Sequence, residues 1–192
     1  VGHTTLRIGA MDRFDRPASA AEIDAMRRAL ETSLEHGAIG MSTGLYYPPA
    51  KAAPSEEVIA LAKPMRAYGG IHTTHMRDEE GGLMTSVEEA LTIGRRAQLP
   101  VHISHLKAGA KVVWGKSADA IVLIQQARDQ GQRVTADQYP YLGWSTSLSA
   151  VVLPPRLRRG TGKEYVARLD DPETQPLVRQ AIGEAITKYD AG

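Results

Sequence analysis

Residues 70–79 read GIHTTHMRDE, and residues 100–107 read PVHISHLK. Each stretch carries an apolar or β-branched segment that ends on a histidine, and these two histidines, His75 and His105, lie 30 residues apart. That separation is about one strand–helix unit of a parallel α/β protein. Because neighbouring parallel strands end at the same edge of a sheet, we expect the two imidazoles to converge. Convergent histidines at a barrel mouth are a usual way to hold a catalytic metal.

Helix and strand patterns alternate four times around this stretch. Ser19 and Glu22 form a predicted capping box that opens a helix over residues 19–36. Further helices are expected from Ser55 towards residue 68, from a second capping box at Thr85 and Glu88 to residue 97, and over residues 117–130. Strands are expected over residues 38–44, 71–76, 101–106 and 134–138. This alternation predicts a parallel sheet with helices packed against it.

The predicted fold class is α/β, specifically part of a (β/α)8 TIM barrel with about four βα units, followed by a helical excursion. An open doubly wound sheet is the alternative, and polar residues at the ends of short strands favour the barrel. Residues 1–153 are assigned to the partial barrel. Residues 154–192, with helices over 163–169 and 173–188, form the excursion or a lid, or else crossover helices on the outside. The chain begins at Val1 rather than Met, which we interpret as the middle of a domain.

The composition narrows the class of partner. Of the 192 residues, 23 are basic and 22 acidic, so a net charge of +1 gives no electrostatic reason to expect nucleic acid or an anionic membrane. Hydrophobic residues make up 42% of the chain, enough for a sizeable core. The sequence has no cysteine, which excludes disulfides, thiolate ligands and a cysteine nucleophile. Together with the lack of a signal-peptide pattern, this fits the cytoplasmic location that we predict.

His75 and His105 are the candidate metal ligands. Strand side chains alternate between faces, so His72 and His102, an odd number of residues before them, are expected to face the helix layer. Neutral imidazoles suit Zn²⁺, and a hydrolytic zinc site needs three protein ligands and an open position. Asp137, at the end of the fourth strand, is either a third ligand or a cap on the strand end.

Charged residues directly follow both histidines. Residues 77–79 either orient the ligand shell, bind an acidic group or form a loop salt bridge. Lys107 lies two residues after His105 and therefore on the same face, where an ammonium group would contact a carboxylate or phosphate.

These motifs together resemble a known family. Four stretches, GMSTGLYYPP at 40–49, THMRDE at 74–79, ISHLK at 103–107 and DQYPY at 137–141, are similar to the D-aminoacylases, the N-acyl-D-amino-acid deacylases of the amidohydrolase superfamily. The resemblance extends to GHTTLR at residues 2–7 and to the region after residue 153. It implies a (β/α)8 barrel with a small β-domain and a zinc ion that activates water against an amide.

By this resemblance, His75 and His105 correspond to zinc-binding histidines on the fifth and sixth barrel strands. Lys107, Tyr139 and Ser145 correspond to positions that hold the carboxylate of a small-molecule N-acyl amino acid. Arg158, in a cluster with Arg156 and Arg159, is the further candidate for that role.

The chain also departs from the family pattern. The resemblance implies a catalytic aspartate with no counterpart here, so we assign no catalytic residue, and the start of the barrel, its last strand and the small β-domain have no counterpart either. We therefore expect the chain alone to be inactive and its open sheet edges to favour self-association. The alternatives are an amidohydrolase of cyclic amides such as hydantoins or dihydropyrimidines, against which Lys107 argues, and a non-catalytic barrel segment with structural histidines.

Overall fold

The computed structural model describes residues 1–158 and 162–189. Two compact units make up the chain. The first comprises Val1–Ala108 and Val113–Pro140, and the second comprises Gly109–Val112 and Tyr141–Gly192. The second unit thus starts before the boundary at residue 153 that we expect from the sequence, and the domain organisation of the whole protein stays a prediction.

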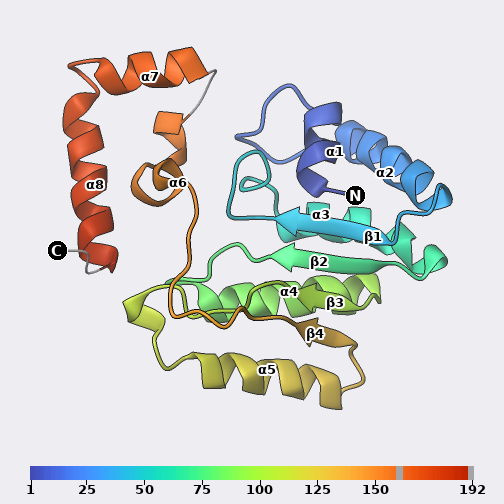
Figure 1. The fold of residues 1–192 in the computed structure, drawn as a ribbon. Helices are drawn as coiled ribbons and strands as arrows, with labels where there is room; N and C mark the ends of the chain where they lie inside the picture. Colours follow the sequence, from blue (N-terminus) through green and yellow to red (C-terminus); the bar gives the residue numbers. More distant parts are fainter. Residues whose placement is uncertain (159–161, 190–192) are drawn as a thin grey trace. The chain divides into compact units, whose positions relative to one another are not determined.

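A four-stranded parallel sheet forms the centre of the first unit (Figure 1). Its strands follow one another in sequence order: β1 (Gly40–Gly44), β2 (Ile71–His75), β3 (Val101–Ile103) and β4 (Val134–Ala136). Gly44 pairs with His75, Thr73 with His102, and His102 with Thr135. Consecutive parallel strands joined by helices confirm the predicted α/β class with four βα units, as in part of a (β/α)8 barrel.

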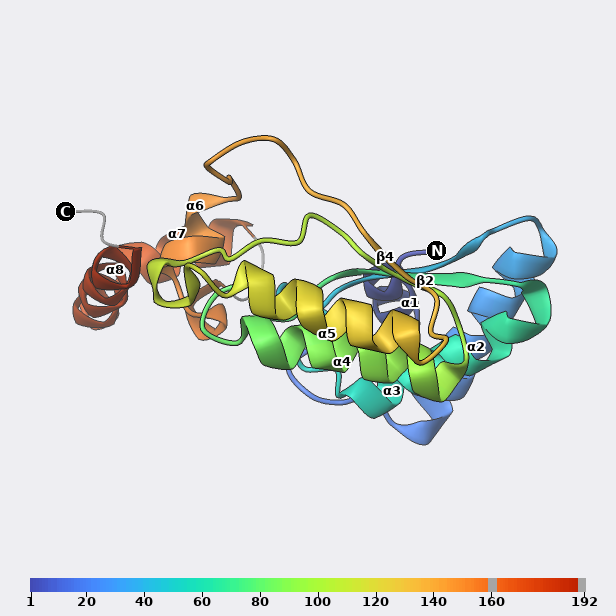
Figure 2. The same cartoon turned by 90° about the horizontal axis from the view of Figure 1, so that it is seen from below.

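In the first unit, α1 (His3–Ala10) and α2 (Ala20–Glu35) precede the sheet, and α3 (Ser55–Ala62), η1 (Lys63–Tyr68), α4 (Leu83–Ala97) and α5 (Ser117–Asp129) connect its strands. The short η2 (Lys111–Val113) precedes α5, and its first two residues belong to the second unit. Figure 2 shows α3, α4 and α5 side by side in one layer against one face of the sheet.

Side-chain alternation divides the strands between two environments. Val101 and Ile103 are buried in the apolar cluster that β3 shares with α4 and α5. His72 and Thr74 of β2 are buried on this helix-covered face as well, whereas Thr73, His75 and His102 are only partly buried. The partly buried residues line the opposite face, which corresponds to the interior of a barrel.

Several element boundaries differ from the sequence-based expectation. The capping box of α2 is confirmed, with Ser19 accepting from the backbone N–H of Glu22. The second capping box is wrong, because α4 begins at Leu83 and Thr85 Oγ1 instead donates to the Gly82 carbonyl at 2.8 Å. Ser55 is the first residue of α3 rather than its cap, and its hydroxyl donates to Glu89 Oε1 at 2.6 Å.

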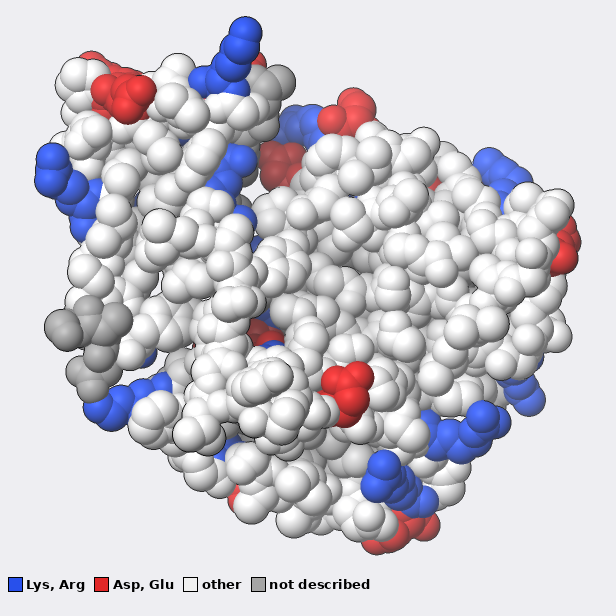
Figure 3. Space-filling view, viewed as in Figure 1, with Lys and Arg blue, Asp and Glu red and all other residues white. Residues whose placement is uncertain are grey.

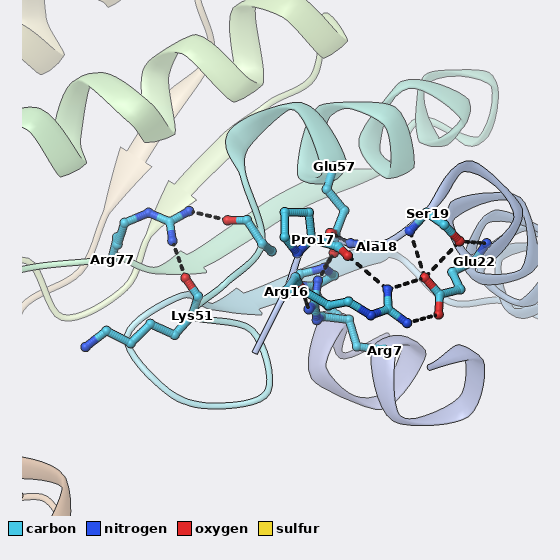
Figure 4. A network of polar contacts seen from close by, with 11 residues as sticks. Arg7, Arg16, Pro17, Ala18, Ser19, Glu22, Lys51, Glu57 and Arg77 are labelled. Carbon is cyan, nitrogen blue, oxygen red and sulfur yellow. Dashed lines mark hydrogen bonds and ion pairs between the residues drawn. The ribbon is translucent and has the colours of Figure 1, made fainter. Parts of the chain in front are cut away.

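A buried ionic network joins α1 to α3 (Figure 4). The Glu57 carboxylate accepts from His3 Nε2 at 3.0 Å, from the Arg7 guanidinium, and from the backbone N–H of Ala18 at 2.9 Å. His3 and Arg7 are fully buried and Glu57 is 2% exposed. Burial alone would raise the pKa of Glu57, but these hydrogen bonds outweigh it and lower that pKa to about 2.

The second unit is helical. It contains α6 (Leu148–Val152), η3 (Pro155–Arg158), α7 (Gly162–Asp170) and α8 (Gln175–Tyr189). Helices α7 and α8 confirm the two predicted helices of this region, whereas α6 has no counterpart among the helices predicted from the sequence. Trp144 supports the unit by donating to the Gly109 carbonyl at 2.9 Å and packing on Tyr189 at 5.8 Å between ring centroids. Whether these helices act as a lid stays a prediction.

Two surface properties bear on the expected partners. Among the described residues, no helix is long and apolar enough to cross a membrane. On the face seen in Figure 3, lysine and arginine occur in small separate groups, several of them beside aspartate or glutamate.

Candidate metal centre

The imidazoles of His75 and His105 lie in direct contact. His75 is the last residue of β2, and His105 lies two residues beyond the end of β3. His75 Nδ1 and His105 Nε2 are 2.8 Å apart, and the ring centroids are 4.5 Å apart. The sequence repeat therefore brings these two side chains together at the carboxyl ends of adjacent strands.

His105 reaches this position through a turn rather than through strand alternation. Its φ angle is 44°, a left-handed backbone conformation that is uncommon outside glycine. Asp137 stabilises the turn, because its carboxylate accepts from the backbone N–H of His105 while its carbonyl accepts from Leu106 at 3.0 Å. The bonds made by Asp137 favour its role as a cap on the strand end over that of a third ligand.

Glu79 contacts the far side of the His105 ring. Its Oε1 lies 3.0 Å from His105 Nδ1, and its Oε2 forms an ion pair with Lys107. The residue is 9% exposed. Burial would raise the pKa of Glu79, but hydrogen bonds from His105 and Lys107 outweigh it and hold that pKa below its ordinary value. Glu79 is therefore an ionised carboxylate enclosed by the residues that it contacts.

Lys107 connects the histidines to an aromatic side chain. Its Nζ lies 2.8 Å from His105 Nδ1 and 5.6 Å from the centroid of the Tyr139 ring. Burial, and then the negative charge of Glu79, raise the pKa of Tyr139 above its ordinary value, so the phenol is neutral. Of the four predicted substrate-binding residues, the structure thus brings Lys107 and Tyr139 together beside the histidine pair.

The chemistry of the donor set fits a zinc ion. One donor atom each from His75, Glu79 and His105 lies within 4.8 Å of the other two. Burial lowers the pKa of His75 to about 4, so its imidazole is neutral at neutral pH. In sites without cysteine, zinc is bound by neutral imidazole nitrogens and by carboxylate oxygens. A carboxylate can also hydrogen-bond to a ligand histidine without touching the metal. The residues present therefore fit the metal that the sequence predicts.

The expectation for His102 is wrong. Its ring lies on the partly buried face of β3 with Nε2 2.8 Å from Asp137 Oδ2 and Nδ1 2.8 Å from Thr135 Oγ1. The cause is the turn at His105, which breaks the alternation that the expectation assumed. The sequence signal that gives the correct face is the apolar pair Val101 and Ile103: both face the helices, so His102 between them faces the other way. His72 does face the helices, and its Nε2 lies 3.0 Å from Thr43 Oγ1.

The residues that follow β2 divide between two roles. Arg77 forms a salt bridge with Glu89 at 2.8 Å, and Asp78 accepts from the backbone N–H of Glu80 at 2.7 Å. Glu79 is the member of this segment that contacts His105. The sequence alone supports only the general expectation that residues 77–79 orient the ligands, bind an acidic group or form a loop salt bridge.

Two further predicted site residues belong to the second unit. Ser145 is exposed in a segment without regular secondary structure, and Arg158 Nε donates to the Leu153 carbonyl at 3.0 Å. Arg159 lies outside the described residues. The roles of Ser145 and Arg158 in substrate binding stay predictions.

Proteins of known function are similar to this chain over about three quarters of its length. No family model matches the chain. Over 148 residues it is 45% identical to D-aminoacylase of Alcaligenes xylosoxydans xylosoxydans, covering 77% of this chain and 30% of the relative. Among solved structures it is 44% identical, with a TM-score of 0.72, to a D-aminoacylase said to define a novel subset of amidohydrolases, covering 74% of this chain and 30% of that one.

A second solved structure carries a metal and an inhibitor. It is N-acyl-D-glutamate deacylase from Bordetella bronchiseptica, complexed with zinc and a phosphonate mimic of the tetrahedral intermediate. The identity is 40% and the TM-score 0.71, over 73% of this chain and 30% of that one.

The fold and these similarities relate the chain to the amidohydrolases. Within that class the resemblance to the D-aminoacylases and N-acyl-D-amino-acid deacylases, indicated by the sequence motifs, is confirmed. The chain spans about 30% of the length of the curated relatives that it matches.

Proposed function

We propose that this chain is the metal-binding and carboxylate-binding segment of a zinc-dependent hydrolase that converts N-acyl-D-amino acids to a D-amino acid and a carboxylate. The observation that carries the proposal is the contact between His75 and His105 at adjacent strand ends, with Lys107 beside them. The names of the relatives support the substrate class.

In this proposal the histidines hold the metal. Zinc bound there would act as a Lewis acid on the amide carbonyl and lower the pKa of a water molecule. His75 Nδ1 and His105 Nε2 face one another and would be its ligands. The neutral form of His75 suits this role, because a ligand nitrogen must be unprotonated.

Lys107 would fix the substrate by its carboxylate. Its side chain is 16% exposed, and its Nζ lies 5.6 Å from the centroid of the Tyr139 ring. A fixed cation at this distance from the metal ligands would hold the amide of an N-acyl amino acid in one orientation. We propose Ser145 and Arg158 as further carboxylate contacts on the strength of the sequence resemblance alone.

The expectations about location, partners and self-association are still predictions. A cytoplasmic location, the absence of nucleic-acid and membrane partners, and self-association through open strands are predictions about the protein. A cyclic amide as the substrate is the alternative, and the relatives' names favour the acyclic N-acyl-D-amino acid.

The test is zinc binding and hydrolysis by the full-length protein. We expect about one tightly bound zinc that the His75→Ala/His105→Ala variant loses, and hydrolysis of N-acetyl-D-leucine or N-acetyl-D-glutamate in preference to the L-enantiomers. Lys107→Met should raise KM by about 10–100-fold, the value of a hydrogen-bonded charge, with a smaller change in kcat. Preferential hydrolysis of dihydrouracil would favour the cyclic-amide alternative, and the absence of zinc binding would favour the non-catalytic one.

A further inference from the structure

We propose that Glu79 is a positioning residue which links the metal ligand His105 to the substrate-binding Lys107, and that it is not itself a metal ligand. This inference rests on the proposed function, because it assigns Glu79 a place in the same site. The evidence for it is that the two carboxylate oxygens of Glu79 contact different residues, His105 and Lys107.

The first observation is the side of the His105 ring that Glu79 contacts. His105 Nε2 faces His75, whereas Glu79 Oε1 lies 3.0 Å from the other nitrogen, Nδ1. A neutral imidazole that binds a metal through Nε2 carries its proton on Nδ1. The Lys107 ammonium lies 2.8 Å from the same Nδ1 but cannot accept its proton, and it donates to Glu79 Oε2 instead. The Nδ1 proton would therefore be donated to Glu79 Oε1, which fixes the tautomer and the orientation of the ring.

The second observation is the partner of the other oxygen. Glu79 Oε2 pairs with Lys107, whose side chain is 16% exposed against 11% for Glu79. A long lysine side chain has many rotamers, and an ion pair with a buried carboxylate restricts them. Glu79 would therefore hold the ammonium group where the substrate carboxylate arrives.

The third observation is the burial of Glu79. The carboxylate is 9% exposed, and a buried polar group needs hydrogen-bond partners, which here are His105 and Lys107. The same two bonds would be lost if Glu79 turned to ligate a metal on the Nε2 side of His105. The geometry therefore favours a Glu79 that supports His105 without binding the metal, although the side chains of His75, Glu79 and His105 lie close enough to form a cluster.

The first experiment measures metal binding in full-length Glu79→Gln. Replacing a carboxylate that hydrogen-bonds to a metal ligand should weaken zinc binding by about 10–100-fold. The Co²⁺-substituted variant should keep the visible absorption spectrum of the wild type, because the ligands are unchanged. A matched control is Glu89→Gln, another partly buried carboxylate in an ion pair, whose described partners are Arg77 and Ser55. Its zinc affinity should equal that of the wild type.

The second experiment measures kinetics at saturating zinc. Glu79→Gln should recover a kcat near that of the wild type while KM for the N-acyl amino acid stays raised by about 10-fold, since Lys107 is no longer held. A Glu79→Asp variant, which keeps the charge on a shorter side chain, should restore part of the zinc affinity.

The outcomes separate this inference from the proposed function. A changed Co²⁺ spectrum would make Glu79 a ligand and overturn the inference, and so would unchanged zinc affinity and KM in Glu79→Gln. A kcat that stays more than 100-fold low at saturating zinc with normal KM would make Glu79 an acid–base group instead. If wild-type protein binds no zinc, the proposed function fails and this inference fails with it.

Discussion

His72 is a fully buried histidine that the structure keeps neutral. Thr43 Oγ1 donates to Thr74 Oγ1 at 2.9 Å, so the same hydroxyl accepts from His72 Nε2–H. His72 Nδ1 has no hydrogen-bond partner among the described residues, and protonating it would place an uncompensated charge in the core. Burial, and then the charge of His3, lower the pKa of His72 to about 4 from its ordinary 6.5.

This lowered pKa predicts a loss of stability on acidification. The unfolded chain binds a proton at His72 below pH 6.5 and the folded chain does so only near pH 4, so the free energy of unfolding decreases as the pH falls through that range. The contribution lost between pH 7 and pH 4.5 is about 2–3 kcal/mol. Urea unfolding of the wild type and His72→Gln at both pH values measures it. The variant should lose that much less stability, and equal losses would show that His72 is not kept neutral.

Asp137 supports the unusual backbone of His105. A left-handed residue other than glycine costs about 1–2 kcal/mol, and the Asp137 carboxylate offsets this by accepting from the His105 N–H. We expect Asp137→Ala to lower the free energy of unfolding by about 1–2 kcal/mol and to weaken zinc binding by about 10-fold. Asp137→Asn retains an oxygen that accepts the same bond, so it should retain most of the zinc affinity. Zinc titration with a competing chelator distinguishes the two variants, and equal affinities of wild type and Asp137→Ala would contradict this role.

One buried carboxylate, that of Glu57, links helices α1 and α3 in addition to their shared apolar cluster. Arg7 is fully buried against Glu57, and its second Nη donates to the Arg16 carbonyl at 2.7 Å. Removing one partner of a buried pair leaves the other charge uncompensated, whereas replacing both with apolar residues is often nearly neutral. We therefore expect Glu57→Gln to lower the free energy of unfolding by about 3–5 kcal/mol. Arg7→Met/Glu57→Leu should lower it less, by an amount that reflects the lost acceptor of His3 and of the Ala18 N–H.

The neighbouring residue on α3 supplies the control. Glu56 pairs with Arg96 at the surface, where solvent screens the interaction, so Glu56→Gln should leave stability almost unchanged. Acidification should reproduce the Glu57→Gln effect. Because the pKa of Glu57 is lowered to about 2, its stabilising contribution is present above pH 4.5 and is lost as the pH falls towards 2. A Glu57→Gln variant as stable as the wild type would show that the network does not hold α1 to α3.

At the scale of elements, the sequence predicts what depends on periodicity and misses what depends on single dihedral angles. The four strands and the intervening helices follow from apolar spacing and from signals such as the Ser19–Glu22 capping box. The end of β3 depends on the left-handed turn at His105, which no local sequence rule indicates for histidine. The contact of Glu79 with His105 and Lys107 joins residues up to 28 positions apart and depends on how the loop after β2 packs.

At the scale of the whole molecule, the two edges of the sheet are unequal. The outer side of β1 is partly covered, because Ser42 N–H donates to the Val1 carbonyl at 2.8 Å and Gly2 forms a bridge with Ser42. Strand β4 pairs only with β3 among the described residues. Arg133 C=O and Asp137 N–H bond to β3, so Ala136, one residue before Asp137, directs its N–H away from β3.

The outer side of β4 is only partly covered, because Arg128 Nε donates to the Val134 carbonyl at 2.8 Å whereas Ala136 is exposed. This edge predicts association of the 192-residue chain through β4. An unpaired edge strand is a template for another strand, and proline blocks such an edge by removing an outward N–H. We expect light scattering to show a mass that increases with concentration for the chain alone, and a smaller increase for Ala136→Pro, which leaves the bonds to β3 intact. Ile39→Lys, a charge added to an exposed residue beside β1, is the control and should have less effect. A concentration-independent monomer would show that β4 is covered in solution, and equal association of both variants would place the contact elsewhere.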